Sequence, residues 1–308
     1  MTVETGIVAT GLPAVLAPVL TPFGPDLAPD AAAFVAWCRR LEGHGIGLAP
    51  FGTTGEGNSL AVEEKAALLD ALAAAGIDLA RVVPGTGACA LTDTVRLTLH
   101  AVRLGCGGVL MLPPFYYKDV SDDALFRSYA EVIERVGDAR LRVLLYHFPR
   151  QSRTPLSPAL VERLRRRYPA TIAGLKDSGG ELANMVAVCR ASPGLAVFTG
   201  SESLLLPLLA AGGTGCISSN ANFNGPAMAR LCRGWRDGDA EAQQAELVRF
   251  RRIFDGLPLI PTLKALAARV TGRPDWRLTR PPLLDLPAGT EQPLLARLQA
   301  EGFAGLVD

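Results

Sequence analysis

The sequence has almost no net charge, and this limits the partners that the protein can be expected to bind. Its 308 residues include 31 lysines and arginines against 30 aspartates and glutamates, which gives a formal net charge of +1. A dedicated nucleic-acid-binding protein normally carries a basic excess or a basic stripe. The dense basic runs, Arg163–Arg167 and Arg249–Arg252, are interpreted as solvated helix faces. We therefore expect no nucleic-acid partner.

Long apolar runs, paired cysteines and clustered histidines are also missing. No continuous apolar run approaches the ~18–20 uncharged residues that a membrane-spanning helix needs. Glycine and proline interrupt the apolar stretch 1–26, which has no basic segment, so a signal peptide is not expected. None of the six cysteines forms a CxxC pair, which favours reduced thiols in a cytoplasmic protein. The three histidines form no HExxH motif, so we expect no metal site and no cofactor.

Short apolar runs alternate with longer amphipathic stretches rich in alanine and leucine. With 49% apolar residues, the chain is long enough for one large core. The runs are continuously apolar, which is typical of parallel strands covered on both faces. The predicted strands are Ala14–Val19, Ile46–Pro50, Val82–Gly85, Gly108–Leu112, Arg142–Tyr146, Ile172–Leu175, Ala196–Thr199 and Gly215–Ser218.

These eight strand–helix units predict an α/β fold, because eight is the number that closes a parallel (β/α)8 TIM barrel. A doubly wound sheet is the alternative, but no G-x-G-x-x-G fingerprint follows the first run. After residue 225 the helical patterns follow one another without strands. We therefore predict a barrel domain over residues 1–225, which carries the active site, and a C-terminal helical appendage over residues 226–308.

Lys176 is the most informative single residue. Only four of the 31 basic residues are lysines, and Lys176 directly follows the apolar run Ile172–Leu175. That is the strand end at which a barrel carries its active site. Unlike arginine, a desolvated lysine can lose its proton and attack a carbonyl group to form a Schiff base. The alternative interpretation is a strand-end lysine that pairs with Asp177.

Two further features follow predicted strands. The turn 52–56 reads Gly-Thr-Thr-Gly-Glu, and its backbone amides and threonine hydroxyls suit a carboxylate. An ordinary strand-to-helix turn is the alternative. Tyr146 ends the fifth run, at the same mouth as Lys176, where a phenol can carry a proton. A packed aromatic side chain is the alternative there.

In order and spacing, several motifs resemble those of the dihydrodipicolinate synthase / N-acetylneuraminate lyase family. They are GTTGE (52–56), GTG (85–87), PPFYY (113–117), LYHFP (145–149), GLKDS (174–178), FTGSE (198–202) and GCIS (215–218). The motifs cover the whole predicted barrel, and the C-terminal helices are similar to those of that family. The resemblance implies a class I aldolase that forms a Schiff base.

The resemblance also implies roles for individual residues. Lys176 would form the imine with pyruvate or another 2-oxo acid, and Tyr146 would be the general acid and base. Thr53 would relay protons between Tyr146 and Tyr116, which in this family reaches in from a neighbouring subunit. The implied substrate-binding residues are Thr53, Thr54, Gly55, Gly200, Ser201, Glu202, Ile217 and Ser219. A homotetramer, built as a dimer of dimers, is therefore expected.

The sequence departs from the synthase pattern where that pattern binds the second substrate. An arginine usually stands five residues after the strand-five tyrosine, but here that position is Gln151, flanked by Arg150 and Arg153. Ser201 stands where a sialic acid lyase is expected to have an acidic residue. These departures favour a lyase of a 2-keto-3-deoxy sugar acid or related oxo acid, with an aldehyde as the other small molecule. The alternatives are 4-hydroxy-tetrahydrodipicolinate synthase, which condenses pyruvate with aspartate semialdehyde, a dehydratase, and a non-catalytic oxo-acid sensor.

Overall fold

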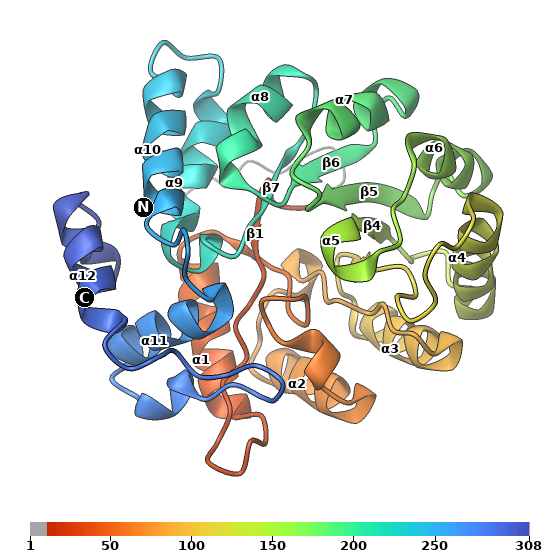
Figure 1. Cartoon of the computed structure of the whole chain (residues 1–308). Coiled ribbons are helices and arrows are strands. Elements are labelled where there is room, and N and C mark those ends of the chain that lie inside the picture. Colours follow the sequence, from red (N-terminus) through yellow and green to blue (C-terminus); the bar gives the residue numbers. More distant parts are fainter. Residues whose placement is uncertain (1–10, 308) are drawn as a thin grey trace.

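A curled parallel sheet lies at the centre of the molecule, and helices surround it (Figure 1). The computed structural model describes residues 11–307, so the first ten residues of the stretch considered for a signal peptide lie outside it. The strands are ordered β2-β1-β7-β6-β5-β4-β3, and each pairs in parallel with its neighbours. Their bounds are β1 Val15–Ala17, β2 Gly47–Leu48, β3 Val109–Met111, β4 Val143–His147, β5 Ile172–Asp177, β6 Ala196–Thr199 and β7 Gly215–Ile217.

The predicted strand Val82–Gly85 is present as a bridging segment, which corrects the prediction of eight regular strands to seven. Parallel bridges join Leu48 to Val82 and Gly85 to Leu110. Leu110 N also donates to Pro84 O at 2.8 Å. Proline has no N–H to donate in return, which accounts for the interrupted ladder. Both edges of the seven-stranded sheet therefore pair with one segment, and the sheet curls toward a closed barrel.

Helices follow the strands as the periodicity predicts. They are α1 Ala31–Gly43, α2 Val62–Ala74, α3 Leu91–Leu104, α4 Asp122–Val136, α5 Pro149–Ser152, α6 Pro158–Arg167, α7 Leu182–Ala191 and α8 Leu205–Ala210. Side chains cap several of them: Asp30 accepts from Ala33 N at 2.9 Å, which satisfies one of the free amides at the start of α1. Short 3-10 helices lie at Gly57–Ser59, Leu79–Arg81, Glu202–Leu204, Pro274–Arg277 and Ala304–Leu306.

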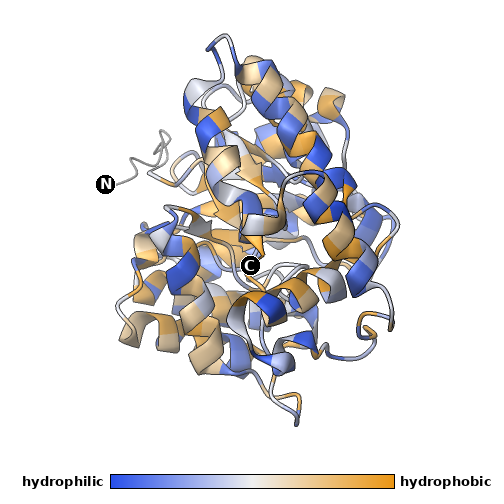
Figure 2. Ribbon diagram, turned by 90° about the vertical axis from the view of Figure 1, so that its left-hand side faces the viewer, coloured by the Kyte–Doolittle hydropathy of each residue, from blue (hydrophilic) through white to orange (hydrophobic). Residues whose placement is uncertain are grey.

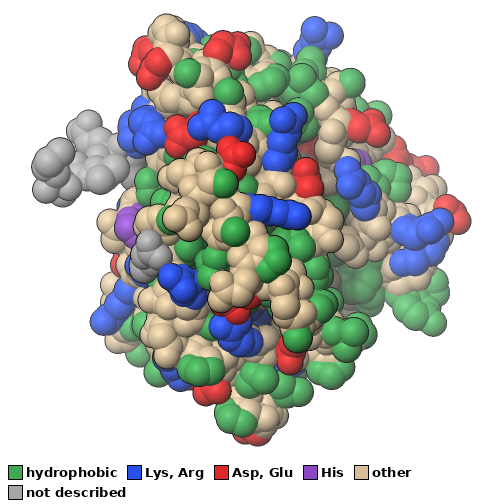
Figure 3. Space-filling view, turned by 60° about the vertical axis from the view of Figure 1, so that its left-hand side comes forward, with side chains coloured by type: hydrophobic (Ala, Val, Ile, Leu, Met, Phe, Trp, Pro, Cys, Tyr) green, Lys and Arg blue, Asp and Glu red, His purple; other side chains and the backbone are tan. Residues whose placement is uncertain are grey.

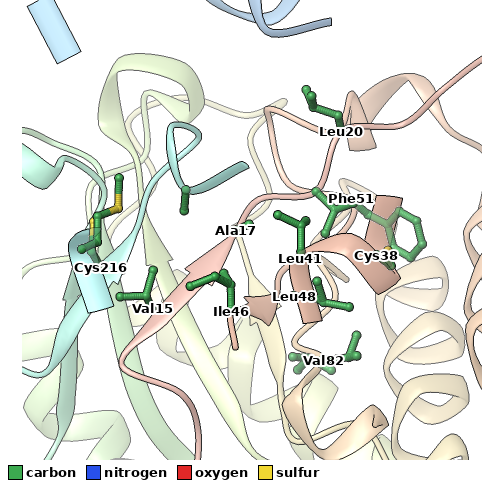
Figure 4. Close-up of a cluster of buried hydrophobic side chains, with 14 of the residues drawn as sticks. Val15, Ala17, Leu20, Cys38, Leu41, Ile46, Leu48, Phe51, Val82 and Cys216 are labelled. Carbon is green, nitrogen blue, oxygen red and sulfur yellow. The ribbon is translucent and has the colours of Figure 1, made fainter. Parts of the chain in front are cut away.

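Buried side chains form one layer inside the curled sheet and another between the sheet and the helices. Along β4, Leu144 and Tyr146 belong to the inner layer and Leu145 to the outer one, because successive side chains of a strand point to opposite faces. Figure 4 shows part of the outer layer, with Leu41 and Leu48 in it. Figure 2 shows strands coloured mainly as hydrophobic at the centre and hydrophilic residues on the outer helices. Tyr146 is thus directed into the interior of the sheet.

The chain after β7 continues as helices. They are α9 Ala221–Gly234, α10 Ala240–Arg252, α11 Leu259–Thr271 and α12 Glu291–Ala300. Helix α9 packs against β1 and spans position 226, and α10 packs against α9. The division of the chain at residue 225 into two domains stays a prediction.

The surface formed by residues 11–307 carries both basic and acidic side chains. Figure 3 shows basic and acidic side chains interspersed on one face of the molecule. No helix in this part of the chain has the length and apolar character needed to cross a membrane. All six cysteines are free.

Candidate active site

A cavity of about 870 Å³ opens at the carboxyl ends of the strands. Each of the strands β4 to β7 contributes side chains at or just after its last residues, and the turn after β2 contributes Thr53 and Thr54. The lining residues from these strand ends include Tyr146, Arg150, Gln151, Lys176, Ser178, Gly200, Ser201, Ile217 and Ser219. The cavity is therefore at the end of the barrel where sequence reasoning predicted the site. Among residues 11–307, no group of three or more His, Cys, Asp or Glu side chains could hold a metal ion.

Lys176 and Tyr146 are direct neighbours across the β4–β5 pair. The Lys176 Nζ lies 4.3 Å from the centroid of the Tyr146 ring, and each residue is 4% exposed. Phe148 stacks on Tyr146, with the two ring centroids 5.7 Å apart. The amine is thus held out of bulk water against an aromatic face, at the wall of a cavity large enough for a small organic acid.

Asp177 does not form the ion pair with Lys176 that the alternative interpretation required. Its carboxylate accepts from Gly179 N at 2.7 Å and from Asn184 Nδ2 at 2.7 Å. Within the described part of the chain, Lys176 makes no ion pair. Successive residues of a strand point to opposite faces, which separates the two side chains although they are adjacent in sequence. The Lys176 amine therefore stays available to a molecule in the cavity.

Thr53 connects the turn 52–56 to the phenol. Its Oγ1 lies 3.5 Å from Tyr146 Oη, at the outer limit of a hydrogen bond. The N–H groups of Thr54 and Gly55 make no hydrogen bond to other parts of residues 11–307. Free amides and hydroxyls at one turn are suited to bind a carboxylate. The geometry thus brings a candidate carboxylate site and a candidate proton carrier together.

Close backbone packing determines the shape of this turn. A Cβ on Gly55 would lie 2.4 Å from Val19 O, so no other residue fits there without a shift of the backbone. Thr21 Oγ1 donates to Gly55 O at 2.7 Å and fixes the turn from the other side. Gly55 itself does not line the cavity. The contribution of Gly55 is therefore to the backbone shape of the turn.

Arg150 and Gln151 line the cavity, whereas Arg153 does not. Arg153 is the last residue of the turn that α5 makes, with a φ of +52°. Arg150 Nη2 lies 3.4 Å from Gly179 O, so its guanidinium is on the rim beside the end of β5. An arginine therefore does line the cavity here, but it is Arg150, one residue before the position that is usual in the synthases.

Arg251 is a lining residue that sequence reasoning missed. It belongs to the basic run 249–252, which was interpreted as a solvated helix face, and for Arg249 this is what the structure has: its side chain is 54% exposed beside Glu301. Arg251 turns the other way, and its Nη1 lies 3.4 Å from Glu202 Oε2. No local signal separates the two arginines, because only the packing of α10 on the barrel decides which of them faces the cavity.

Glu202 lies behind the cavity wall and not in it. Its side chain is fully buried, and its carboxylate accepts from Ser218 Oγ at 2.5 Å and from Asn220 Nδ2 at 2.6 Å. Gly200 and Ser201 do line the cavity. The structure therefore gives Glu202 contact with Arg251 and not with the cavity itself.

Tyr116 is on the surface of this chain and outside the cavity. It is 74% exposed, and its ring packs edge-on against Tyr117 with the ring centroids 5.4 Å apart. It does not line the cavity with Tyr146 and Thr53. Within one chain the relay is thus incomplete, and the expected contribution from a neighbouring subunit stays a prediction.

Comparisons with known proteins identify the family of the chain. The model of the dihydrodipicolinate synthetase family matches residues 12–301. An uncharacterized DapA-like lyase of Chloroflexus aurantiacus is 33% identical over 279 residues, which cover 88% of this chain and 91% of that protein. A 4-hydroxy-tetrahydrodipicolinate synthase of Symbiobacterium thermophilum is 32% identical over 292 residues, which cover 93% of this chain and 97% of that protein.

Solved structures have the same fold. The dihydrodipicolinate synthase from Agrobacterium tumefaciens matches with a TM-score of 0.86 at 30% identity, over 93% of this chain and 98% of that one. A prophage protein of the same family from E. coli K12, in complex with pyruvate, matches with a TM-score of 0.85 at 28% identity, over 98% of this chain and 100% of that one. With a family match across almost the whole chain and curated relatives above 30% identity, the chain belongs to the dihydrodipicolinate synthetase family and is an enzyme, a lyase of the class I aldolase type.

Proposed function

We propose that the protein is a pyruvate- or 2-oxo-acid-dependent Schiff-base lyase that cleaves or forms a 2-keto-3-deoxy sugar acid or a related oxo acid. The observation that carries the proposal is the buried Lys176 Nζ, 4.3 Å from the Tyr146 ring, in a cavity that also holds Thr53 and Thr54. A nucleophilic amine, a proton carrier and a carboxylate site are the groups that this chemistry needs.

In the proposed cleavage, the neutral Lys176 amine attacks the carbonyl carbon of the oxo acid and expels water to form an imine. Thr53, Thr54 and the free amides of their turn hold the substrate carboxylate. Tyr146 protonates the departing hydroxyl as the imine forms, and the resulting phenolate then accepts the proton of the hydroxyl on C4. The bond between C3 and C4 breaks, and an aldehyde leaves. The electron pair of that bond passes to the protonated imine, which becomes an enamine. Protonation at C3 and hydrolysis then release pyruvate and free Lys176.

The distal part of the cavity supports an oxygen-rich substrate. Ser201, Ser203 and Ser219 offer hydroxyls there, and Arg150 and Arg251 offer guanidinium groups. Hydroxyls pair well with the hydroxyls of a sugar acid, and guanidinium groups pair with carboxylates. The second candidate function is 4-hydroxy-tetrahydrodipicolinate synthase. It is favoured by Arg150, one residue from the position expected in synthases, and by the name of the Symbiobacterium thermophilum relative.

Two further points belong to the same proposal. The enzyme acts in the cytoplasm as a homotetramer, a dimer of dimers in which Tyr116 completes the site of a neighbouring subunit. The 74% exposure of Tyr116 in the single chain is compatible with that arrangement. Light scattering on the purified protein tests the assembly, and a monomer with full activity would contradict it.

Borohydride trapping with pyruvate tests the proposed function. We expect an adduct of one reduced pyruvate per chain, mapped to the peptide that contains Lys176. Pyruvate release from 2-keto-3-deoxy acids and condensation of pyruvate with aspartate semialdehyde then separate the two candidates. If neither pyruvate nor longer 2-oxo acids label the protein, the lyase mechanism is wrong and the sensor alternative replaces it.

A further inference from the structure

Glu56 is a fully buried acidic residue in a backbone conformation that favours glycine. It ends the turn 52–56, its φ is +54°, and its side chain is 0% exposed. A non-glycine residue keeps such a conformation only when its surroundings hold it there. The contacts of its carboxylate stabilise this conformation, and the partners in these contacts are distant in sequence.

The Glu56 carboxylate joins three segments. Its Oε1 accepts from Lys264 Nζ on α11 at 2.6 Å, across 208 residues of sequence. Its Oε2 accepts from Arg280 N at 2.8 Å. Arg280 belongs to the segment 279–287, which we call the C-terminal strap. The carboxylate therefore touches the turn 52–56, α11 and the strap at once.

All three segments line the same cavity. The turn contributes Thr53 and Thr54, the start of α11 and the residues before it contribute 258–261, and the strap contributes 282–285 and Pro287. In Figure 1 the dark blue chain between α11 and α12 crosses in front of α1 and α2. One buried carboxylate thus lies where the proposed carboxylate site and the distal wall of the cavity meet.

Polar contacts, rather than a hydrophobic core, hold the strap in place. The Arg280 guanidinium donates to Leu27 O at 2.7 Å, to Ser59 O at 2.7 Å and to Glu64 at 2.5 Å. Thr279 N and Oγ1 both donate to Asp285 Oδ1 at 3.1 Å and close the strap into a loop. Leu284, which directly precedes Asp285, is 82% exposed. The position of the strap therefore depends on its anchor at residue 280.

We propose that Glu56 is a positioning residue for the reaction, which ties the carboxylate-binding turn, α11 and the C-terminal strap into one unit. The inference rests on the proposed function, because it assumes that the turn binds the carboxylate of the oxo acid. A buried ion pair is weak as a source of stability, since its Coulomb attraction is offset by the cost of removing both charges from water. It does define the geometry of the groups that it joins, and a displacement of about 1 Å in a site is enough to lower the rate strongly.

A pair of variants separates positioning from stability. Glu56→Gln removes the ion-pair partner of the buried Lys264 ammonium, so we expect a lower melting temperature. The double variant Glu56→Gln with Lys264→Met removes both charges and should recover most of the melting temperature. If Glu56 positions the turn, the pyruvate concentration for half-maximal borohydride trapping stays about tenfold higher in the double variant than in the wild type. The overturning result is a double variant that is trapped at the wild-type pyruvate concentration.

A matched control uses another ion pair near the C-terminus. Arg277 Nη1 donates to Glu291 at 2.6 Å, and neither residue lines the cavity. The double variant Arg277→Met with Glu291→Gln should leave the pyruvate concentration for trapping unchanged. If the pyruvate concentration for trapping rises equally in both double variants, the cause is a general loss of stability, and the positioning role of Glu56 is wrong.

A second variant keeps the inference testable if the double variant does not fold. Arg280→Ala leaves no fully buried charge without its partner, because Glu56 and Lys264 stay paired and the Glu64 side chain is 28% exposed. Hydrogen–deuterium exchange should then increase in the strap and also in the turn 51–57. An increase confined to the strap would overturn the coupling. Failure of the proposed function is recognised separately, by a wild-type enzyme that pyruvate does not label at Lys176.

Discussion

The Nζ of Lys176 faces the ring of Tyr146 at 4.3 Å from its centroid, while the hydroxyl at the end of the same ring lies 3.5 Å from Thr53 Oγ1. One side chain therefore makes two separable contacts. The ring covers the amine, and the oxygen reaches toward the turn 52–56. This separation allows the packing of Tyr146 and its proposed role in proton transfer to be tested independently.

Tyr146→Phe should keep the ring over Lys176 and lose the proton carrier. We expect borohydride trapping with pyruvate to persist and turnover to fall by about 10²–10⁴-fold, the usual contribution of a general acid or base. Steady-state rates and trapping on the same preparation measure both. Tyr129→Phe is the control. The Tyr129 hydroxyl donates to Met111 O at 3.2 Å, and the residue does not line the cavity. Unchanged turnover in Tyr146→Phe would remove Tyr146 from the mechanism.

Lys176→Arg should fold and lose all turnover. The substitution keeps a long basic side chain near Tyr146, but a guanidinium cannot be deprotonated to attack a carbonyl group. Intact mass after borohydride treatment should show no pyruvate adduct, and the melting temperature should stay within a few degrees of the wild type. Lys118→Arg, at a position that does not line the cavity, should be labelled as the wild type is. Any adduct in Lys176→Arg would place the imine on another residue.

Tyr116→Phe tests the contribution of a neighbouring subunit. The residue is 74% exposed in the single chain, so we expect the variant to fold normally and to lose activity. Oligomers mixed from Tyr116→Phe and Tyr146→Phe chains should regain part of the activity, because some sites then combine both intact tyrosines. Absence of recovery in mixed oligomers verified by mass would show that the two residues do not act across subunits.

Arg150→Ala should weaken the second substrate and not pyruvate. Loss of a charge-assisted hydrogen bond costs about 1.5–3 kcal/mol, which corresponds to a KM for an acidic second substrate about 10–100-fold higher. Arg153→Ala is the matched control. Arg153 lies three residues further along the same segment but does not line the cavity, so this variant should keep the wild-type KM. The reverse ranking would mean that α5 changes conformation when substrate binds.

His147 should contribute to the pH dependence of stability. Burial lowers the pKa of His147, although Asp177 and Glu181 oppose the shift, and its Nδ1 accepts from Leu156 N at 3.0 Å. The unfolded chain therefore binds a proton at a higher pH than the folded chain does. Stability from this residue is present above the unfolded pKa of about 6.5 and is lost as pH falls from there toward the folded pKa.

Urea unfolding of His147→Asn between pH 8 and pH 5 measures this contribution. Asparagine keeps an acceptor near the position of Nδ1 and cannot be protonated, so the free energy of unfolding should fall less steeply with decreasing pH. His44→Asn is the comparison, because burial also lowers the pKa of His44. A slope identical to that of the wild type in His147→Asn would contradict the assignment.

Local patterns in the sequence were sufficient for the strands and for the residues at their ends. Lys176 follows a continuous apolar run and Tyr146 ends one, and parallel strands that close on themselves bring such positions to one mouth. The one strand that failed to form regularly, Val82–Gly85, contains Pro84, whose missing N–H interrupts the ladder.

The sequence by itself determined the curled parallel sheet and the placement of Lys176 and of the turn 52–56 at its mouth, because these depend on hydrophobic periodicity and on residues that are close in the chain. Only the tertiary structure decided that Arg251 faces the cavity while Glu202 lies behind its wall. Only it joined Glu56 to Lys264 across 208 residues. The physical reason is that the direction of a side chain on a helix, and the partner of a buried charge, depend on how distant elements pack, which no local pattern records.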